Sequence, residues 1–424
     1  MKSVTKSIQS VRKFYFLEYY FVLLESIKKY NSYEEIFDSF KSLKQKYQLG
    51  ESKYKKLTSE QETLTRSQLN RYRYTFDQVI EESKEFKFIY AKKENIYLTD
   101  TGNELLKAFK SSNHVLANNI LLRKMEERYN AFRHLINLSY NSNKSGLLIF
   151  PVYSPLKLGF ERNSIKTTED IIKYSYSLVE KLEEDIKIHL KQNISLTEPN
   201  NELLTRLMES KVIHEVRNKP FEAAKYNAIT KRFRDFWMNF FLKNIYKYEY
   251  SMASFDIWAY RGKQLGVNNI TEFYPNFSGR IVYSLSVLSK TINSEDFLEA
   301  FTYSNGEKLF IHRPSFDTIQ DKFIDSLVKA YFQLRRTSHS YFINLMSLRE
   351  LVCYNLKITE KNFDDFLGKA YKLNLANKLR IRISLEVDKL PSETKAMYLK
   401  QEPVLIDNKY RNIIALDVTK REKR

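Results

Sequence analysis

Residues 65–109 read TRSQLNRYRYTFDQVIEESKEFKFIYAKKENIYLTDTGNELLKAF, and this stretch decides the fold of the amino-terminal end. Thr65 and Gln68 have the spacing of a capping box, which predicts that a helix begins near Arg66. Apolar side chains then recur at the spacing of one helix face, which we expect to pack inward. These side chains are Leu69, Tyr72, Phe76, Val79 and Ile80.

The second half of the stretch predicts a β-hairpin and a further helix. Residues 86–100 give two short strands around a tight Lys-Lys-Glu-Asn turn at 92–95. Thr99 or Asp100 is placed to cap the helix that follows, and Thr101-Gly102 to make the turn before it.

Two helices are predicted before this stretch. Residues 12–30 are dense in aromatic side chains and indicate a buried first helix. Ser32 is placed to cap a second helix, with Glu34 and Glu35 in its first turn, where the helix dipole favours acids. The order of helix, short helix, capped helix and two strands resembles a winged helix, a compact helix-turn-helix with a β-hairpin wing. This resemblance implies that the third helix enters the major groove of DNA.

The outward side chains of the third helix are of the types that contact DNA. Amide, hydroxyl and guanidinium groups read base edges and bind phosphates, and the basic tip of the wing could touch the backbone. The expected contacts are Arg66, Ser67, Asn70, Arg71, Arg73, Tyr74, Lys92 and Lys93. Glu81, Glu82 and Glu85 come later, where the helix should leave the DNA. The alternative is a winged helix that packs only against protein.

The carboxy-terminal end repeats this order and also resembles a winged helix. The predicted elements are a helix over 317–336 capped by Asp317, a short helix over 347–356, a helix capped by Thr359, and strands over 378–387 and 410–418. Its expected DNA contacts are Lys361, Asn362, Lys369, Lys372, Lys378, Arg380 and Arg382. Asp365, in the middle of the same helix face, would repel phosphate, so packing against protein is an equal alternative here.

The middle of the chain resembles no family. Helices are predicted over 115–138, 168–191, 202–216 and 220–248, and a short strand or buried connector over 145–153. The aromatic side chains of 233–241 recur at helical spacing, which favours a core-facing stripe over a surface that stacks on bases. Residues 258–280 are interpreted as a loop bordered by Arg261, Lys263 and Arg280. The predicted domains are 1–112, 113–312 and 313–424.

Composition bounds the class of protein. The 424 residues include 70 Lys and Arg against 51 Asp and Glu, a net charge of +19, and 43% of them are hydrophobic. Such a chain is globular, and its positive charge favours a nucleic-acid partner. Only 9 Gly and 8 Pro argue for a mainly α fold with small β-hairpin wings. The abundance of Lys, Tyr, Asn and Ile is typical of an AT-rich genome and suggests a bacterial source.

The sequence offers no familiar catalytic or cofactor motif. It lacks phosphate-binding glycine loops, paired cysteines and zinc-binding histidine pairs, so we expect no cofactor and no metal. Acidic groups such as Asp317, Asp321 and Asp325 are interpreted as solvated helix faces, and Cys353 as a buried, inert thiol. No apolar run approaches the ~20 residues that span a bilayer, and the basic, apolar start is interpreted as the first helix of a cytoplasmic protein.

These observations favour a non-enzymatic DNA-binding subunit of a bacterial DNA-handling system, of the anti-phage defence or restriction type. Its winged helices would contact duplex DNA, and its middle domain a partner protein. The alternatives are a restriction-type nuclease with a cryptic metal-dependent site, a plasmid replication initiator, and a scaffold whose winged helices bind protein.

Overall fold

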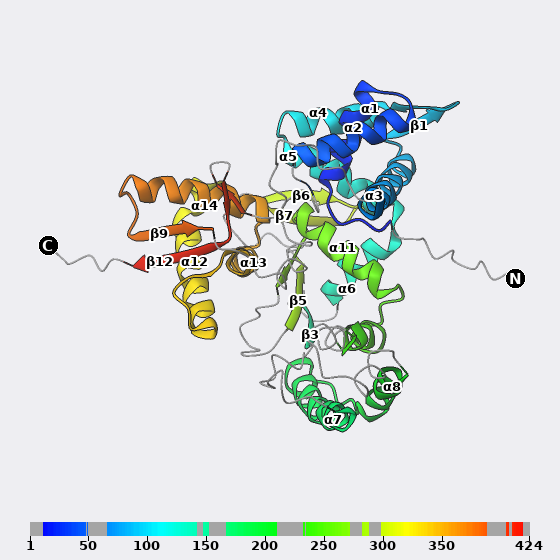
Figure 1. The fold of residues 1–424 in the computed structure, drawn as a ribbon. Coiled ribbons are helices and arrows are strands. Elements are labelled where there is room, and N and C mark those ends of the chain that lie inside the picture. The colour runs from blue at the N-terminus through cyan, green and yellow to red at the C-terminus, as the bar shows by residue number, and fades with distance from the viewer. Residues whose placement is uncertain are drawn as a thin grey trace, which may run out of the picture. The chain divides into compact units, whose positions relative to one another are not determined.

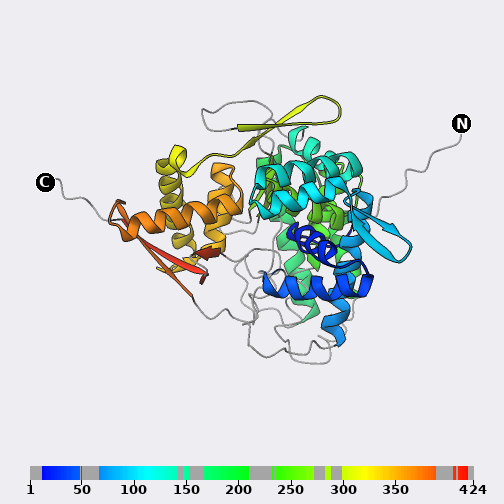
Figure 2. The same ribbon diagram turned by 90° about the horizontal axis from the view of Figure 1, so that it is seen from above.

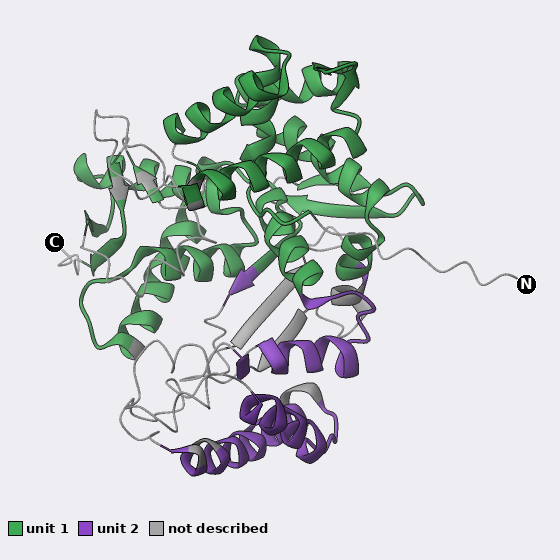
Figure 3. Cartoon of the chain, turned by 45° about the vertical axis from the view of Figure 1, so that its right-hand side comes forward, with its two compact units in different colours: residues 1–136, 253–269, 288–424 green, residues 137–252, 270–287 purple. Residues whose placement is uncertain are grey.

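The structure is a computed structural model in which the chain forms two compact units (Figure 3). Unit 1 comprises residues 1–136, 253–269 and 288–424, and unit 2 comprises residues 137–252 and 270–287. The structure describes residues 12–47, 49, 66–141, 147–151, 167–209, 232–233, 235–271, 282–287, 298–387, 404–406 and 409–418. The predicted division at 112/113 and 312/313 stays a prediction.

The chain is mainly α-helical with small antiparallel β-hairpins, as predicted (Figure 1). Among the described residues, no helix is both long enough and apolar enough to cross a bilayer.

The amino-terminal module follows the predicted order. Its elements are α1 (Glu18–Lys29), α2 (Tyr33–Lys46), α3 (Arg66–Glu85), β1 (Ile89–Lys92), β2 (Asn95–Leu98) and α4 (Asp100–Lys110). Helix α3 begins at Arg66 as expected, whereas Thr65, the predicted capping residue, lies outside the described residues. The two strands pair from Ile89 opposite Leu98 to Lys92 opposite Asn95, and the hairpin projects from the helices as a narrow ribbon (Figure 2).

The predicted inward face of α3 does pack inward. Tyr72, Phe76, Val79 and Ile80 are buried, and Leu69 is half-buried. The ring centroid of Phe76 lies 5.2 to 5.3 Å from those of three aromatic side chains of α2, which are Tyr33, Phe37 and Phe40. Aromatic contact of this kind fixes α3 against α2.

Gly102 is not the turn residue that the sequence predicted. Thr99 caps α4 by accepting a hydrogen bond from the Gly102 N–H, which places Gly102 in the first helical turn. A Cβ atom at Gly102 would lie 2.1 Å from the carbonyl oxygen of Phe88. Glycine is therefore required by the close approach of α4 to the backbone before β1.

The carboxy-terminal module has the same plan. Its elements are α12 (Phe316–Ser338), β8 (Ile343–Asn344), α13 (Leu345–Leu356), α14 (Glu360–Leu375), β9 (Ile381–Glu386), β10 (Val404–Ile406), β11 (Lys409–Arg411) and β12 (Ile413–Val418). Thr359 caps α14 as predicted, by accepting from Asn362 N. The predicted cap Asp317 is wrong, because Ser315 accepts from Thr318 N and begins the helix two residues earlier.

In both modules a segment between the first two helices pairs with the second strand of the wing. In the carboxy-terminal module β12 lies between β8 and β9. In the amino-terminal module the equivalent contact is an isolated bridge between Ser32 and Asn95. The two ends of the chain therefore share the element order of a winged helix.

The remainder of unit 1 comprises α5 (His114–Arg128), the first part of α6 (Asn130–Asn141), α11 (Met252–Leu265) after its first residue, the first half of β4 (Asn268–Thr271), β6 (Leu298–Thr302) and β7 (Lys308–His312). The helix predicted over 115–138 is two helices, because Tyr129 adopts extended backbone angles between them. The interpretation of 258–280 as a loop is wrong at its start, since 258–265 form the end of α11.

Unit 2 contains β3 (Leu147–Pro151), α7 (Thr168–Asp185), α8 (Thr197–Met208) and β5 (Val282–Val287), with single π-helical turns η3 (Ile186–Leu190) and η4 (Phe241–Ile245). Strand β3 confirms the predicted strand, and it pairs with β5. Of the predicted core-facing stripe, Phe233, Trp237 and Phe241 are buried, whereas Phe236 and Phe240 are half-buried. Residues 210–231, which include the end of the predicted helix 202–216 and the start of the predicted helix 220–248, lie outside the described residues.

Candidate nucleic-acid interface

The amino-terminal half of α3 presents polar side chains to solvent. Arg66, Asn70 and Tyr74 follow one another at four-residue spacing, which places them on one face, and Arg71 lies beside them. All four are exposed, Tyr74 by 49%. Within the described part of the chain, none of the four has a hydrogen bond or an ion pair. Ser67 lies in the same turn of helix, but its side chain lies outside the described part.

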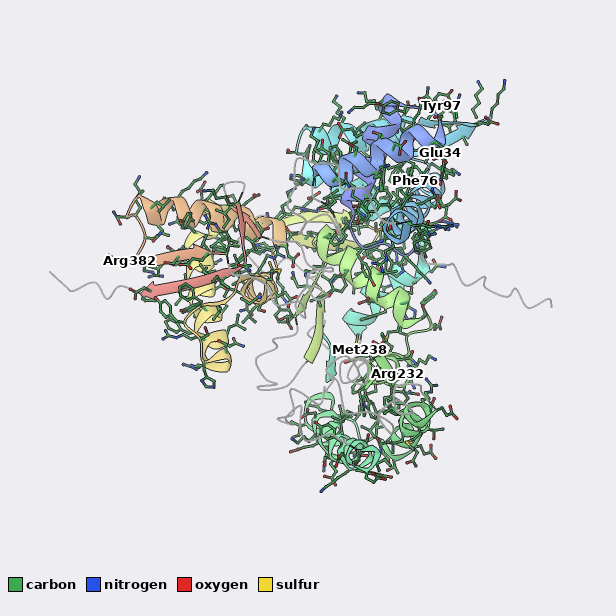
Figure 4. All side chains as sticks on the ribbon, in the orientation of Figure 1. Glu34, Phe76, Tyr97, Arg232, Met238 and Arg382 are labelled. Atoms are coloured by element: carbon green, nitrogen blue, oxygen red, sulfur yellow. The ribbon has the colours of Figure 1, made fainter. Side chains whose placement is uncertain are left out.

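Arg73 differs from these neighbours because its guanidinium is engaged within the module. Its Nη1 and Nη2 donate to the two carboxylate oxygens of Glu34 at 2.8 and 2.9 Å (Glu34 is labelled in Figure 4). Its Cζ lies 4.5 Å from the centre of the Phe37 ring. The hydrogen bonds to Glu34 raise the pKa of Arg73. Arg73 therefore joins α3 to α2, which the sequence alone did not indicate.

The tip of the wing carries two further predicted contacts. Lys92 ends β1, and Lys93 occupies the turn with a φ of 54°. Both side chains are exposed, and neither has an ion pair among the described residues. The amino half of α3 and the wing tip thus hold four cations, Arg66, Arg71, Lys92 and Lys93, that are available to phosphates.

The carboxyl half of α3 is anchored by a buried carboxylate. Glu82 is fully buried, and it accepts hydrogen bonds from Tyr20 Oη at 2.5 Å, Tyr129 Oη at 2.7 Å and Arg261 Nη1 at 3.0 Å. Arg261 also donates to the carbonyl oxygen of Phe14. These bonds satisfy the carboxylate and the guanidinium where no water reaches them.

The charges in this anchor support one another. Burial opposes the charge of Arg261, yet Glu82 keeps its pKa above the ordinary value. Burial raises the pKa of Tyr20, and the adjacent Glu82 carboxylate raises it further. The tyrosines therefore stay neutral and donate, and Glu82 serves as an acceptor. Glu82 therefore faces inward, and Glu81 and Glu85 pair with the cations Lys84 and Arg12. The sequence had indicated only that these acids lie where the helix would leave the DNA.

The carboxy-terminal module has its own buried ion cluster. Lys263 Nζ lies 2.6 Å from Glu360 Oε1, and Arg349 Nη2 lies 3.5 Å from the other oxygen of the same carboxylate. Arg349 also bonds Asp364 at 3.2 Å. Arg261 and Lys263, which the sequence placed at the borders of a loop, are therefore buried side chains of α11. Arg261 is bonded to α3 and Lys263 to the first turn of α14.

The first turn of α14 is thus engaged within the protein. Lys361 is exposed, and its Nζ lies 3.2 Å from His114 Nδ1. Asn362 is half-buried, and its amide oxygen accepts from Thr359 Oγ1 at 2.6 Å. The two residues expected to lead this helix into DNA are therefore held at its start by internal contacts.

Farther along α14, cations and an acid share the exposed surface. Lys369 and Lys372 are exposed, and Lys369 Nζ lies 5.8 Å from the centre of the Phe316 ring. Asp365 is exposed among these lysines, as the sequence suggested. A phosphate approaching this face meets both signs of charge.

The wing of the carboxy-terminal module is similarly mixed. Side chains of β9 alternate between buried and exposed, which places Arg380 before the strand and Arg382 within it on the solvent side (Arg382 is labelled in Figure 4). Arg380 forms an ion pair with Asp325, and Arg382 lies opposite Asp417 on β12. Lys378 is exposed at the end of the preceding turn.

Comparisons with known proteins do not identify this chain. No protein-family model, no curated protein and no solved structure matches it. The shared element order therefore gives a topology, and the function has to be argued from side chains.

The acidic side chains and Cys353 are the groups that could hold a metal ion or act as a nucleophile. Among the described residues, no group of three or more His, Cys, Asp or Glu side chains is arranged to hold a metal ion. Cys353 is buried, as predicted, and this burial raises the pKa of its thiol. Asp317, Asp321 and Asp325 are exposed as expected, whereas Asp364 pairs with Arg349.

Unit 2 has a hollow of about 330 Å³ beside α8. Its walls are mostly apolar, and two arginines, Arg206 and Arg232, lie at it together with Asp235 (Arg232 and the neighbouring Met238 are labelled in Figure 4). Arg206 pairs with Glu202 of its own helix.

Proposed function

We propose that this protein binds duplex DNA without acting on it as an enzyme, through the amino half of α3 and the tip of the β1–β2 wing. One observation carries the proposal. Arg66, Asn70 and Arg71 are exposed at the start of the third helix of a winged-helix arrangement, and none has an internal hydrogen bond or ion pair among the described residues.

The chemistry of these side chains supports this proposal. Arginine donates to the two acceptors of guanine, and asparagine pairs with adenine, in the major groove. Lys92 and Lys93 at the wing tip add charges for backbone phosphates, within a chain of net charge +19. In winged helices the amino half of the third helix is the part that enters the groove, and here the opposite half is fixed by Glu82.

The cellular role that fits is a cytoplasmic subunit of a bacterial DNA-handling system, of the anti-phage defence or restriction type. Unit 2 exceeds what DNA contact alone requires, which supports a protein partner there. The arginine-edged hollow beside α8 is a candidate contact for that partner.

The test is the binding of labelled duplex across a range of salt concentrations. The variant R66A/N70A/R71A should lose at least ~10-fold in affinity, and its log–log salt slope should fall by about 2. A matched control removes the exposed Lys28 and Lys107, which lie on α1 and α4. That control should keep the affinity to within ~2- to 3-fold, since side chains that do not contact phosphates release no counterions from the DNA.

Circular dichroism and thermal melting establish that each variant is folded. Unchanged duplex affinity in the folded triple variant contradicts the proposal. Equal losses of duplex affinity in the triple variant and in the control would mean that the protein attracts DNA only through its net charge.

A further inference from the structure

The outer face of the β1–β2 wing carries an aromatic pair. Strand pairing sets Tyr90 opposite Tyr97 and Lys92 opposite Asn95, and these side chains share one face of the ribbon. Ile96 is on the other face and is buried. The hairpin thus packs with one face and presents tyrosines with the other (Tyr97 is labelled in Figure 4).

The two rings form an offset stack with an open side. Their centroids lie 5.5 Å apart with an interplanar angle of 27°. Tyr90 is 49% exposed, whereas Tyr97 is half-buried, and its hydroxyl is 3.4 Å from Asn95 Nδ2. Tyr97 therefore supports the ring of Tyr90 from one side.

A planar ring held in this way is suited to stack on another planar ring. Bases stack on aromatic side chains with little regard to their identity, because every base has a π-face. Inside a duplex both faces of each base are already covered by its neighbours. A base that is unpaired at a duplex end or junction has a free face, and Lys92 on the same side of the ribbon can bind the adjoining phosphate.

We infer that Tyr90, supported by Tyr97, stacks on an unpaired base at a duplex end or junction, so that the protein prefers DNA with such a base to continuous duplex. The inference rests on the proposed duplex contact, because α3 holds the paired part while the wing takes the unpaired base. If the tyrosine pair served the hairpin alone, it would act as an ordinary cross-strand contact and leave DNA preference unchanged.

The experiment compares a blunt duplex with the same duplex carrying a short unpaired arm, by fluorescence anisotropy. Wild type should bind the armed DNA roughly 10-fold more tightly, and Tyr90→Leu should remove most of that preference without changing affinity for the blunt duplex. Tyr90→Phe keeps the ring and should keep the preference. A 2-aminopurine in the arm should be quenched by wild type and Y90F, and not by Y90L.

Tyr176→Leu is the matched control, since Tyr176 on α7 is also 49% exposed and should not affect either DNA. Equal binding of both DNAs by wild type, or an unchanged preference in folded Y90L, overturns the stacking inference and leaves the duplex proposal intact. Absence of binding to either DNA by wild type overturns the proposed function, and the stacking inference with it.

Discussion

The amino-terminal and carboxy-terminal modules follow one order of helices and strands, but their third helices are anchored at opposite ends. Helix α3 is fixed by Glu82 in its carboxyl half, which leaves Arg66 and Arg71 at its start exposed. Helix α14 is fixed at its first turn, where Glu360 bonds Lys263. The amino end of the third helix, which our proposal places against DNA, is therefore exposed in the first module and engaged within the protein in the second.

Both modules expose aromatic side chains, and in the amino-terminal module Tyr74 and Tyr90 are each 49% exposed. In the carboxy-terminal module Phe332, Tyr341 and Phe342 are 37%, 46% and 39% exposed, and the guanidinium of Arg335 lies 5.2 Å from the Tyr341 ring. Exposed aromatic groups of this kind are typical of protein contacts. The difference between the anchored ends teaches that a repeated topology need not leave the same part of its third helix exposed. We therefore expect protein packing rather than DNA contact for α14.

Breaking the buried pair of Glu82 with Arg261, which anchors α3, should have the largest effect on stability. Glu82→Gln leaves Arg261 charged and buried without its counterion, which should lower the free energy of unfolding by about 3–5 kcal/mol. Urea denaturation measures it. Glu81→Gln, in an exposed pair with Lys84, should cost less than ~1 kcal/mol. A cost for E82Q as small as that of E81Q would mean that the anchor does not hold α3.

The contrast between the third helices can be tested with equal changes of charge. R66A/R71A should weaken duplex binding by at least ~10-fold, because both guanidiniums are available to DNA. K361A/K369A on α14 removes the same charge and should weaken it by no more than ~3-fold. Anisotropy titrations at one salt concentration suffice. Equal losses would assign both modules to DNA.

Replacing either of two helical glycines by alanine should change stability, in opposite directions for the two positions. Gly102→Ala places a methyl group against the Phe88 carbonyl, so it should destabilise the amino-terminal module by about 1–3 kcal/mol. Gly368, within α14, has open space where its Cβ would lie. Gly368→Ala should therefore stabilise by about 0.5–1 kcal/mol, through lower chain entropy in the unfolded state. Thermal melting compares the two, and stabilisation by G102A would refute the close packing of α4.

The smallest expected effect is a change in stability that depends on pH. Burial lowers the pKa of Lys357, which follows α13, from 10.5 to about 8. Below about pH 8 the ammonium group is charged in both the folded and the unfolded protein, and its burial lowers the free energy of unfolding. This loss of stability decreases as the pH rises from about 8 to 10.5, because the folded protein no longer carries the charge. Lys357→Met should stabilise the protein by ~1 kcal/mol at pH 7 and by less at pH 10.

Lys87, which follows α3 with a φ of 58°, provides the control for this substitution. Its side chain is exposed, so Lys87→Met should change stability little at either pH. Urea denaturation of both variants at the two pH values makes the comparison. A gain for K357M that is the same at pH 7 and pH 10 would exclude the titration of Lys357 as its source.

Local patterns predicted the parts of the fold that depend on local physics. The apolar spacing of α3 and the caps at Thr99 and Thr359 identified these helices, because periodicity and capping act within a few residues. The cap of α12 was misplaced by two residues, since Ser315 and Asp317 are both suitable capping types and only packing decides between them.

Features that depend on contacts between residues far apart in the sequence were not predicted. The end of helix α11, from residue 258, was interpreted as a loop because Gly262 and Gly266 are typical of turns. In the structure Gly262 leaves room for the Asn268 side chain, whose oxygen would lie 1.9 Å from a Cβ there. Arg73 was interpreted as a DNA contact because nothing within its own helix indicates Glu34. Such pairings are set by tertiary contact alone.

The Glu82 anchor also bears on how the protein can be divided. Its partners Tyr129 and Arg261 lie 47 and 179 residues farther along the chain. A fragment that ends after residue 112 would lose both, and its Glu82 would keep only Tyr20 as a donor. A shortened amino-terminal module should therefore fold well only with Glu82 replaced by an apolar side chain, or with α11 supplied as a second polypeptide.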